Sequence, residues 1–129
     1  LLCNKENINF GYIVDGERLN FMKKEDIYAL FGNIIDNAIE AVLKIEEAKR
    51  VISLKVKASG KMLVVNAFNY FDGALKIENG EIQTAKKDKA YHGFGLKSIR
   101  FISQKYNGDL RITAENGVFT LTIIFPFAV

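Results

Sequence analysis

Two asparagines, Asn33 and Asn37, stand one helical turn apart inside an apolar repeat, and their amides could do chemistry. Asparagine is a poor residue for a helix interior, because its side chain competes for backbone hydrogen bonds. Such departures from local preference are typical of functional sites. An amide oxygen is a hard, neutral ligand that suits Mg²⁺, which completes its octahedron with water and substrate phosphates. The alternative is that both amides are solvated or pack against a neighbouring helix.

Two glycines, Gly93 and Gly95, form a second candidate site, at the predicted junction of a long loop and a helix. Glycine lets a backbone approach a ligand closely, and free N–H groups at a helix start favour a phosphate. The order of residues is not that of a Walker A loop, because Lys97 and Ser98 follow Leu96. It is not a dinucleotide fingerprint either, since Ser98 occupies the third glycine position. The pair alone is therefore a weak signal.

The charge balance is mildly basic, with 18 Lys and Arg against 15 Asp and Glu in 129 residues. The excess is spread along the chain, so it does not by itself predict a nucleic-acid surface. Its one dense patch, at Lys86, Lys87 and Lys89, precedes the glycine pair and could close over phosphates. A solvated, charged loop is the alternative.

The composition excludes several classes of protein. With 49% hydrophobic residues the chain can build a core, which excludes intrinsic disorder. The single cysteine, Cys3, and the single histidine, His92, exclude an intrachain disulfide and a zinc site built from these residues. No apolar run approaches the roughly 18 to 20 residues of a membrane helix. Because the sequence begins with Leu1, we expect a piece of a longer or processed protein.

Hydrophobic periodicity predicts two helices that position these residues. Apolar residues at helical spacing predict a long helix from about Lys24 to Ala48, with Asn33 and Asn37 at the border of its buried stripe. A second helix is predicted from about Gly95 to a left-handed stop at Asn107 and Gly108. On this helix Phe101 and Tyr106 have the spacing of packing residues.

Alternation of apolar and polar residues predicts the sheet. The predicted strands are Ile8–Val14, Val51–Ala58, Met62–Asn69, and a hairpin of Leu110–Ala114 and Phe119–Phe125 around Asn116 and Gly117. Residues 70–94 lack periodicity, which is typical of a functional loop. This order predicts an α+β fold, a two-layer sandwich of helices on a mostly antiparallel sheet, in one domain covering residues 1–129.

Two runs resemble motifs of a known superfamily. Residues 30–41, LFGNIIDNAIEA, resemble the N box of the GHKL ATPases, which include gyrase, heat-shock chaperones, mismatch-repair proteins and histidine kinases. Residues 92–99, HGFGLKSI, resemble the second glycine box, and residues 105–110 resemble the helix end and strand that follow it. Both runs are similar to those of peptide-pheromone quorum-sensing kinases of Gram-positive bacteria. The resemblance covers the whole chain and implies the Bergerat-type ATP-binding fold.

The resemblance implies that the chain binds ATP with Mg²⁺. Asn37 would be the catalytic Mg²⁺ ligand that bridges to the phosphates, supported by a second catalytic residue, Asn33. ATP-hydrolysing members carry a glutamate at the position of Asn33 to activate water. An amide has no basic lone pair for that step, which favours a kinase. Backbone donors and lid residues complete the implied nucleotide site: Gly93, Gly95, Leu96, Thr84, Lys86 and Lys87.

The adenine-binding segment departs from the family pattern. Most histidine kinases carry an Asp-x-Gly-x-Gly box after the strand that ends here near Asn69. This chain instead has the run NYFDG at residues 69–73. Asn69 is expected to take the adenine-binding role, and Asp72 remains a competitor for it.

The implied function is that of the catalytic domain of a two-component sensor histidine kinase. It would transfer the γ-phosphate of ATP to a histidine on a separate dimerisation domain, and would be inactive without that domain. His92 would be a residue of the lid hinge and not the acceptor. A response regulator would be an indirect partner, and a missing N-terminal part would attach this cytoplasmic domain to the membrane. The alternatives are an anti-sigma-factor-type serine kinase and a degenerate GHKL domain that only binds partners.

Overall fold

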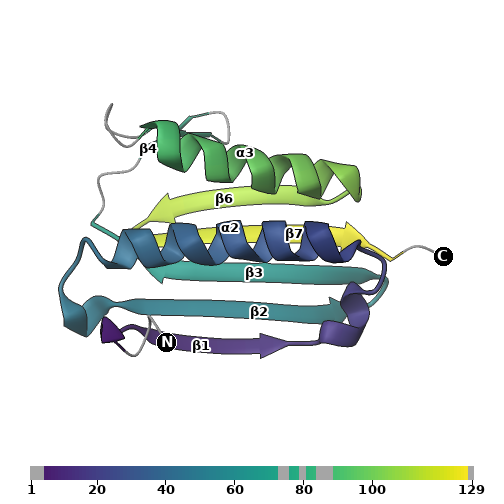
Figure 1. Cartoon of the computed structure of the whole chain (residues 1–129), viewed down its shortest axis with the longest axis horizontal. Helices are drawn as coiled ribbons and strands as arrows, with labels where there is room; N and C mark the ends of the chain where they lie inside the picture. Colours follow the sequence, from purple (N-terminus) through teal and green to yellow (C-terminus); the bar gives the residue numbers. More distant parts are fainter. Residues whose placement is uncertain (1–4, 73–75, 79–80, 84–88, 128–129) are drawn as a thin grey trace.

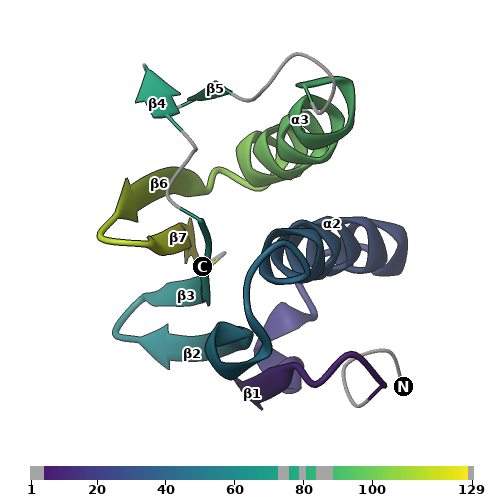
Figure 2. The ribbon, with the colours of Figure 1, turned by 90° about the vertical axis from the view of Figure 1, so that its left-hand side faces the viewer.

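Two long helices lie side by side on one face of a five-stranded sheet (Figures 1 and 2). The computed structural model describes residues 5–72, 76–78, 81–83 and 89–127, and gives residues 76–78, 81–83 and 89–94 by their backbone alone. The strand order is β1-β2-β3-β7-β6, which confirms the predicted α+β sandwich. The elements are β1 (Asn9–Val14), η1 (Gly16–Leu19), α2 (Lys24–Val42), η2 (Glu47–Lys49), β2 (Val51–Ser59), β3 (Met62–Tyr70), β4 (Lys76–Glu78), β5 (Glu81–Gln83), α3 (Lys89–Lys105), β6 (Asp109–Glu115) and β7 (Val118–Pro126).

The sheet follows from the alternation in the sequence. Every second residue of β3 and β7 is buried against the helices, including Leu63, Val65, Ile123 and Phe125. All neighbouring strands are antiparallel except β1, which runs parallel to β2 because α2 crosses over between them. Strands β6 and β7 meet at a turn with positive φ at Asn116 (53°) and Gly117 (75°), as the predicted two-residue hairpin requires.

Helix α2 buries the predicted stripe through Leu30, Ile34, Ala38 and Val42, but it ends at Val42 and not near Ala48. The guanidinium of Arg50 explains this difference, because it donates hydrogen bonds to the carbonyls of Ile45 (3.1 Å) and Glu6 (2.7 Å). These bonds hold the chain in a turn that leads into β2. Ile45 still packs on the apolar cluster, so the apolar periodicity continues past the end of the helix.

Helix α3 begins at Lys89, earlier than predicted, so the glycine pair lies inside the helix and not at its junction with a loop. Glycine is unfavourable in a helix interior. The prediction from helix propensity therefore placed the start of α3 too late in the sequence. Packing of α3 against α2 overrides that preference. The segment predicted to lack structure also contains β4 and β5, whose three residues each are too few to show alternation. Neither α2 nor α3 is long and apolar enough to span a membrane.

The end of α3 confirms the predicted left-handed stop. Asn107 has a φ of 60°, and the N–H of Gly108 donates to the carbonyl of Ser103 at 2.7 Å, as in a Schellman motif. Gly108 then passes directly over the core. A Cβ at this position would stand 2.7 Å from Cε1 of Phe125 and 2.9 Å from Cγ2 of Ile123. The turn therefore has no room for a side chain at residue 108.

We expect Gly108→Ala to lower the free energy of unfolding by about 1–3 kcal/mol, because the added methyl overpacks the core. Urea unfolding followed by circular dichroism measures the change. Gly16→Ala is the matched control, since no atom lies within 4 Å of its Cβ position, and it should stay within about 0.5 kcal/mol of the unmutated chain. Equal stability of the two variants would contradict this account of the turn.

Candidate functional site

The two predicted motifs meet at Asn37 of α2 and Gly95 of α3. A Cβ built on Gly95 would stand 3.0 Å from Oδ1 and 3.4 Å from Nδ2 of Asn37. The first separation is tighter than nearly all real Cβ contacts. Gly95 is buried and Asn37 is half-buried. The absence of a side chain at residue 95 therefore lets the α3 backbone lie directly against the Asn37 amide.

The two asparagines differ in what their amides already bind. Nδ2 of Asn33 donates a hydrogen bond of 2.7 Å to the carbonyl of Ala29, one turn earlier in the same helix. Within the described part of the chain, no hydrogen bond involves the side chain of Asn37. The Asn37 amide is therefore available to a ligand, whereas the nitrogen of Asn33 is held along α2. The described residues contain no cluster of three or more His, Cys, Asp or Glu placed to bind a metal.

Asn69, the predicted adenine residue, is a buried polar side chain near the end of β3, with 3% of its surface exposed. It lies on the face of β3 that the helices cover, and its Nδ2 donates to the carbonyl of Tyr70 at 3.0 Å. In the sheet it pairs with Ile52, which packs against Ala38 and Val42 of α2. Asn69 therefore lies under the same half of α2 as Asn37. The competing Asp72 is exposed beyond the strand end.

The remaining predicted site residues gather at the same end of the molecule or lie outside the described residues. Figure 1 shows the end of α2, the start of α3 and the tip of β3 on its left-hand side. Gly93 lies in the N-terminal part of α3, and Leu96 is half-buried and packs on the core. The predicted lid residues Thr84, Lys86 and Lys87 lie outside the described residues.

The opposite end of the helix pair carries a polar cluster that the sequence analysis missed. Oδ2 of Asp26 accepts hydrogen bonds from the hydroxyl of Tyr106 and from Nζ of Lys105, the latter at 2.9 Å. These bonds lower the pKa of Asp26, and the same carboxylate raises the pKa of Tyr106 and of Lys105. The Tyr106 hydroxyl also accepts the backbone N–H of Lys23 at 3.1 Å.

This cluster completes the start of α2. Its N-cap residue is Lys23, which has no side-chain oxygen to accept a free helix N–H. In a capping box the third helical residue reaches back to the N-cap N–H. Here the hydroxyl of Tyr106 stands between the two groups, bonded to the N–H of Lys23 and to the carboxylate of Asp26. The local sequence carries no signal for this bond, because Tyr106 lies 80 positions after Asp26.

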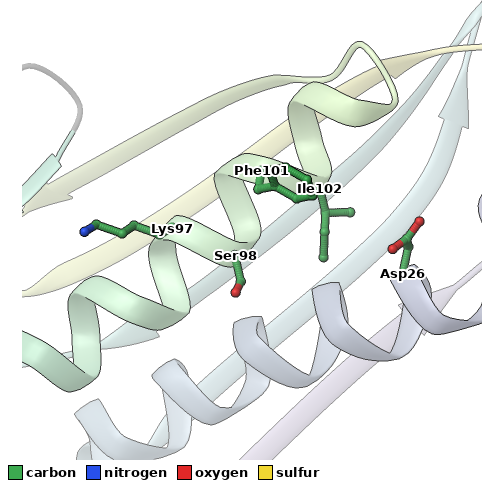
Figure 3. A pocket seen from close by; sticks show the side chains of 5 residues that line it. All are labelled: Asp26, Lys97, Ser98, Phe101 and Ile102. Carbon is green, nitrogen blue, oxygen red and sulfur yellow. The ribbon is translucent and has the colours of Figure 1, made fainter.

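A groove of about 370 Å³ lies along the helix pair, lined by Asp26, Lys97, Ser98, Phe101 and Ile102 (Figure 3). It includes neither Asn37 nor Gly95. Phe101 is 68% exposed, so the prediction that it is a packing residue is wrong. Ile102 takes the buried position next to it, and the neighbouring side of α3 faces solvent. The same prediction for Tyr106 is confirmed, since its ring contacts that of Phe21 edge-on at 5.8 Å.

Comparison with known proteins agrees with this arrangement. The sequence model of a family described as "GHKL domain" matches residues 22–126. No curated protein sequence matches the chain.

Solved structures show the same fold at low sequence identity. The catalytic domain of histidine kinase ThkA is 19% identical with a TM-score of 0.67, over 97% of this chain and 83% of that one. Histidine kinase AdeS of Acinetobacter baumannii is 11% identical with a TM-score of 0.65, over 98% of this chain. The histidine kinase domain of Erythrobacter litoralis EL346 is 16% identical with a TM-score of 0.61, over 97% of this chain. The match covers 58% of the AdeS chain and 55% of the EL346 chain.

Proposed function

The chain belongs to the GHKL domain family, and on this premise we propose that it binds Mg·ATP as the catalytic domain of a sensor histidine kinase. The observation that carries the proposal is the contact between the unbonded Asn37 amide and the bare backbone of Gly95. One group offers an oxygen ligand, and the other lets the α3 backbone lie close beside that ligand. The similarity to histidine kinase catalytic domains supports a kinase in particular.

Asn37 is the Mg²⁺ ligand in this proposal, and Asn33 supports the site from the preceding turn. The residues fit that role, because Oδ1 of Asn37 is not engaged by any described residue. Bound Mg²⁺ would neutralise charge on the phosphates, which is the main requirement of phosphoryl transfer. Asn33 cannot act as the base that activates water, which favours a kinase over a hydrolytic enzyme.

The glycine pair would contact the phosphates through its backbone. In a helix that begins at Lys89, the first four N–H groups are free, and those of Gly93 and Gly95 lie beyond them. For Gly93 to donate, the first turn of α3 must therefore open when nucleotide binds. Opening is favoured by glycine, which is about 1 kcal/mol less favourable than alanine in a helix interior. Leu96 and the lid residues Thr84, Lys86 and Lys87 complete this side of the proposed site.

Asn69 is the proposed adenine contact. Its side chain is buried on the helix-covered face of the sheet, under the same half of α2 as Asn37. An amide presents both a donor and an acceptor, which matches the amino group and ring nitrogen of adenine. Asp72 is exposed beyond the strand end, and this placement favours Asn69 over it.

The proposal also includes the partners with which this domain would act. The phosphoacceptor is a histidine on a dimerisation domain, and a response regulator receives the phosphate from it. The resemblance of residues 30–41 and 92–99 to quorum-sensing kinases supports a cytoplasmic domain of a membrane-bound sensor.

Titration calorimetry with ATP, in the presence of Mg²⁺ and then of EDTA, tests the proposal. We expect saturable binding that weakens when Mg²⁺ is removed. Incubation with radiolabelled ATP and a histidine-bearing acceptor domain should then give an acid-labile phosphoprotein. An acid-stable product would favour the serine-kinase alternative, and binding without transfer would favour a non-catalytic module. Absence of binding at millimolar Mg·ATP would overturn both kinase interpretations.

A further inference from the structure

Helices α2 and α3 run antiparallel and carry one specific contact near each end (Figure 1). At one end Asn37 lies against Gly95. At the other end Asp26 bonds to Lys105 and Tyr106. About three turns, or roughly 15 Å of helix, separate the two contacts along each helix. The position of α2 along α3 therefore determines both contacts together.

We propose that Asp26, Lys105 and Tyr106, here termed the helix clamp, are positioning residues that hold Asn37 in place against Gly95. The part of this inference that concerns nucleotide rests on the proposed function. The part that concerns the geometry of Asn37 does not.

Apolar contacts and the clamp both join the two helices, but they differ in kind. Leu30 and Ile34 of α2 share one core cluster with Ile99 and Ile102 of α3. The hydrophobic effect that holds these side chains together is not directional. Hydrogen bonds to a carboxylate are directional and weaken steeply when their angle changes. The clamp therefore adds a directional constraint to the packing of the apolar side chains.

The clamp is also more rigid than an ordinary surface ion pair. The side chain of Asp26 is only 17% exposed, although that of Lys105 is 41% exposed. The ring of Tyr106 packs edge-on against the ring of Phe21, with 5.8 Å between the ring centroids. The ring of Phe21 in turn contacts that of the buried Phe125, with 5.6 Å between the centroids. The hydroxyl that bonds to Asp26 is thus fixed by the core. A displacement of α2 would break its bonds to both Asp26 and the N–H of Lys23.

The site at the far end of the helix pair lies where the two helices approach each other closely. The Cβ position of Gly95 is already 3.0 Å from Oδ1 of Asn37. Because glycine carries only a hydrogen at that position, the Asn37 amide lies beside the α3 backbone, and a displacement of α2 along α3 would change the backbone groups that surround the amide. Residues that hydrogen-bond directly to a metal ligand typically change metal affinity about 10- to 100-fold when they are mutated. The clamp lies about three helical turns from Asn37, so we expect an effect at the lower end of this range.

Two clamp variants, Asp26→Asn and Tyr106→Phe, test this inference in the nucleotide-free protein by ¹H–¹⁵N NMR. Tyr106→Phe keeps the ring and removes only the hydroxyl. We expect the side-chain NH₂ signals of Asn37 and the amide signal of Gly95 to shift in both variants. Calorimetry should show affinity for Mg·ATP reduced about tenfold. Lys105→Arg keeps the ion pair and should retain the signals and the affinity.

Asp109→Asn is the matched control. It removes the exposed ion pair with Arg111 on β6, which has a length of 3.1 Å and involves none of the three clamp residues. The control should leave the Asn37 and Gly95 signals unchanged. If the clamp variants lower the melting temperature but leave those signals in place, the clamp is merely structural and the inference is wrong. If Tyr106→Phe does not fold, Asp26→Asn decides the question. If the unmutated protein binds no nucleotide, the proposed function fails, and the NMR signals still decide the role of the clamp.

Discussion

Asn37→Ala is expected to abolish detectable Mg·ATP binding while the domain remains folded. The substitution removes the proposed Mg²⁺ ligand, and loss of even an indirect contact to a metal costs about 10- to 100-fold in affinity. The fold should not suffer, because no described residue forms a hydrogen bond with the Asn37 side chain. Alanine is also about 0.7 kcal/mol more favourable than asparagine in a helix interior. Calorimetry and urea unfolding measure the two effects separately.

Asp36→Ala, at the exposed neighbouring position on α2, is the control for Asn37→Ala. It should bind Mg·ATP as the unmutated domain does. A second comparison uses EDTA, because the proposed role of Asn37 acts through the metal. In EDTA the affinities of Asn37→Ala and the unmutated domain for ATP should therefore converge. Binding of Mg·ATP by Asn37→Ala within twofold of the unmutated domain would show that Asn37 is not the ligand.

Substitutions at Gly95 should weaken nucleotide binding in proportion to the size of the new side chain. The Cβ of Gly95→Ala would stand 3.0 Å from Oδ1 of Asn37, so the amide must move by a few tenths of an ångström. Gly95→Val adds two methyl groups at this contact and should approach the effect of Asn37→Ala. Displacement of a reacting group by about 1 Å can cost about 100-fold in rate, so transfer should decline with binding. Calorimetry across the series measures the trend.

Gly32 provides the matched control for this series, because it also lies inside a helix but has no atom within 4 Å of its Cβ position. Gly32→Ala should keep nucleotide affinity and gain about 1 kcal/mol of stability from helix propensity. A double-mutant cycle gives a readout without nucleotide. If the clash with the amide is the cause, Gly95→Val should destabilise the Asn37→Ala background less than the unmutated domain. Equal losses in both backgrounds would contradict this steric explanation.

The sequence was sufficient to predict the sheet, the turns and most of both helices, because these depend on local patterns. The alternation of β2 and β3 and the turn at Asn116 and Gly117 are examples. The end of α2 was not predictable from periodicity. It depends on hydrogen bonds that Arg50 donates to the carbonyl of Ile45, after the helix, and to the carbonyl of Glu6, before β1. The early start of α3 was missed for a similar reason, because tertiary packing outweighs the low helix propensity of glycine.

The candidate site was predictable in part. The asparagine spacing and the glycine pair identified residues that the fold brings into contact, namely Asn37 and Gly95. The bond between Asp26 and Tyr106 joins residues that are 80 positions apart, and neither residue type is unusual at its position. The exposure of Phe101 could not be predicted from the sequence either, because helical spacing alone does not show how wide the buried stripe of the helix is.

The connection from β3 to α3 has a consequence for how relatives of this domain can diverge. Its two ends are anchored to the folded core independently of the residues between them. The N–H of Phe71 bonds to the carbonyl of Gly117 at 3.0 Å, and Gly95 rests against α2. The entropic cost of closing such a connection grows only logarithmically, by about 0.6 kcal/mol for each doubling of its length. Insertions and deletions in this connection should therefore change the stability of the domain only slightly. Its length and sequence can differ between relatives while the sheet and the helix pair stay the same.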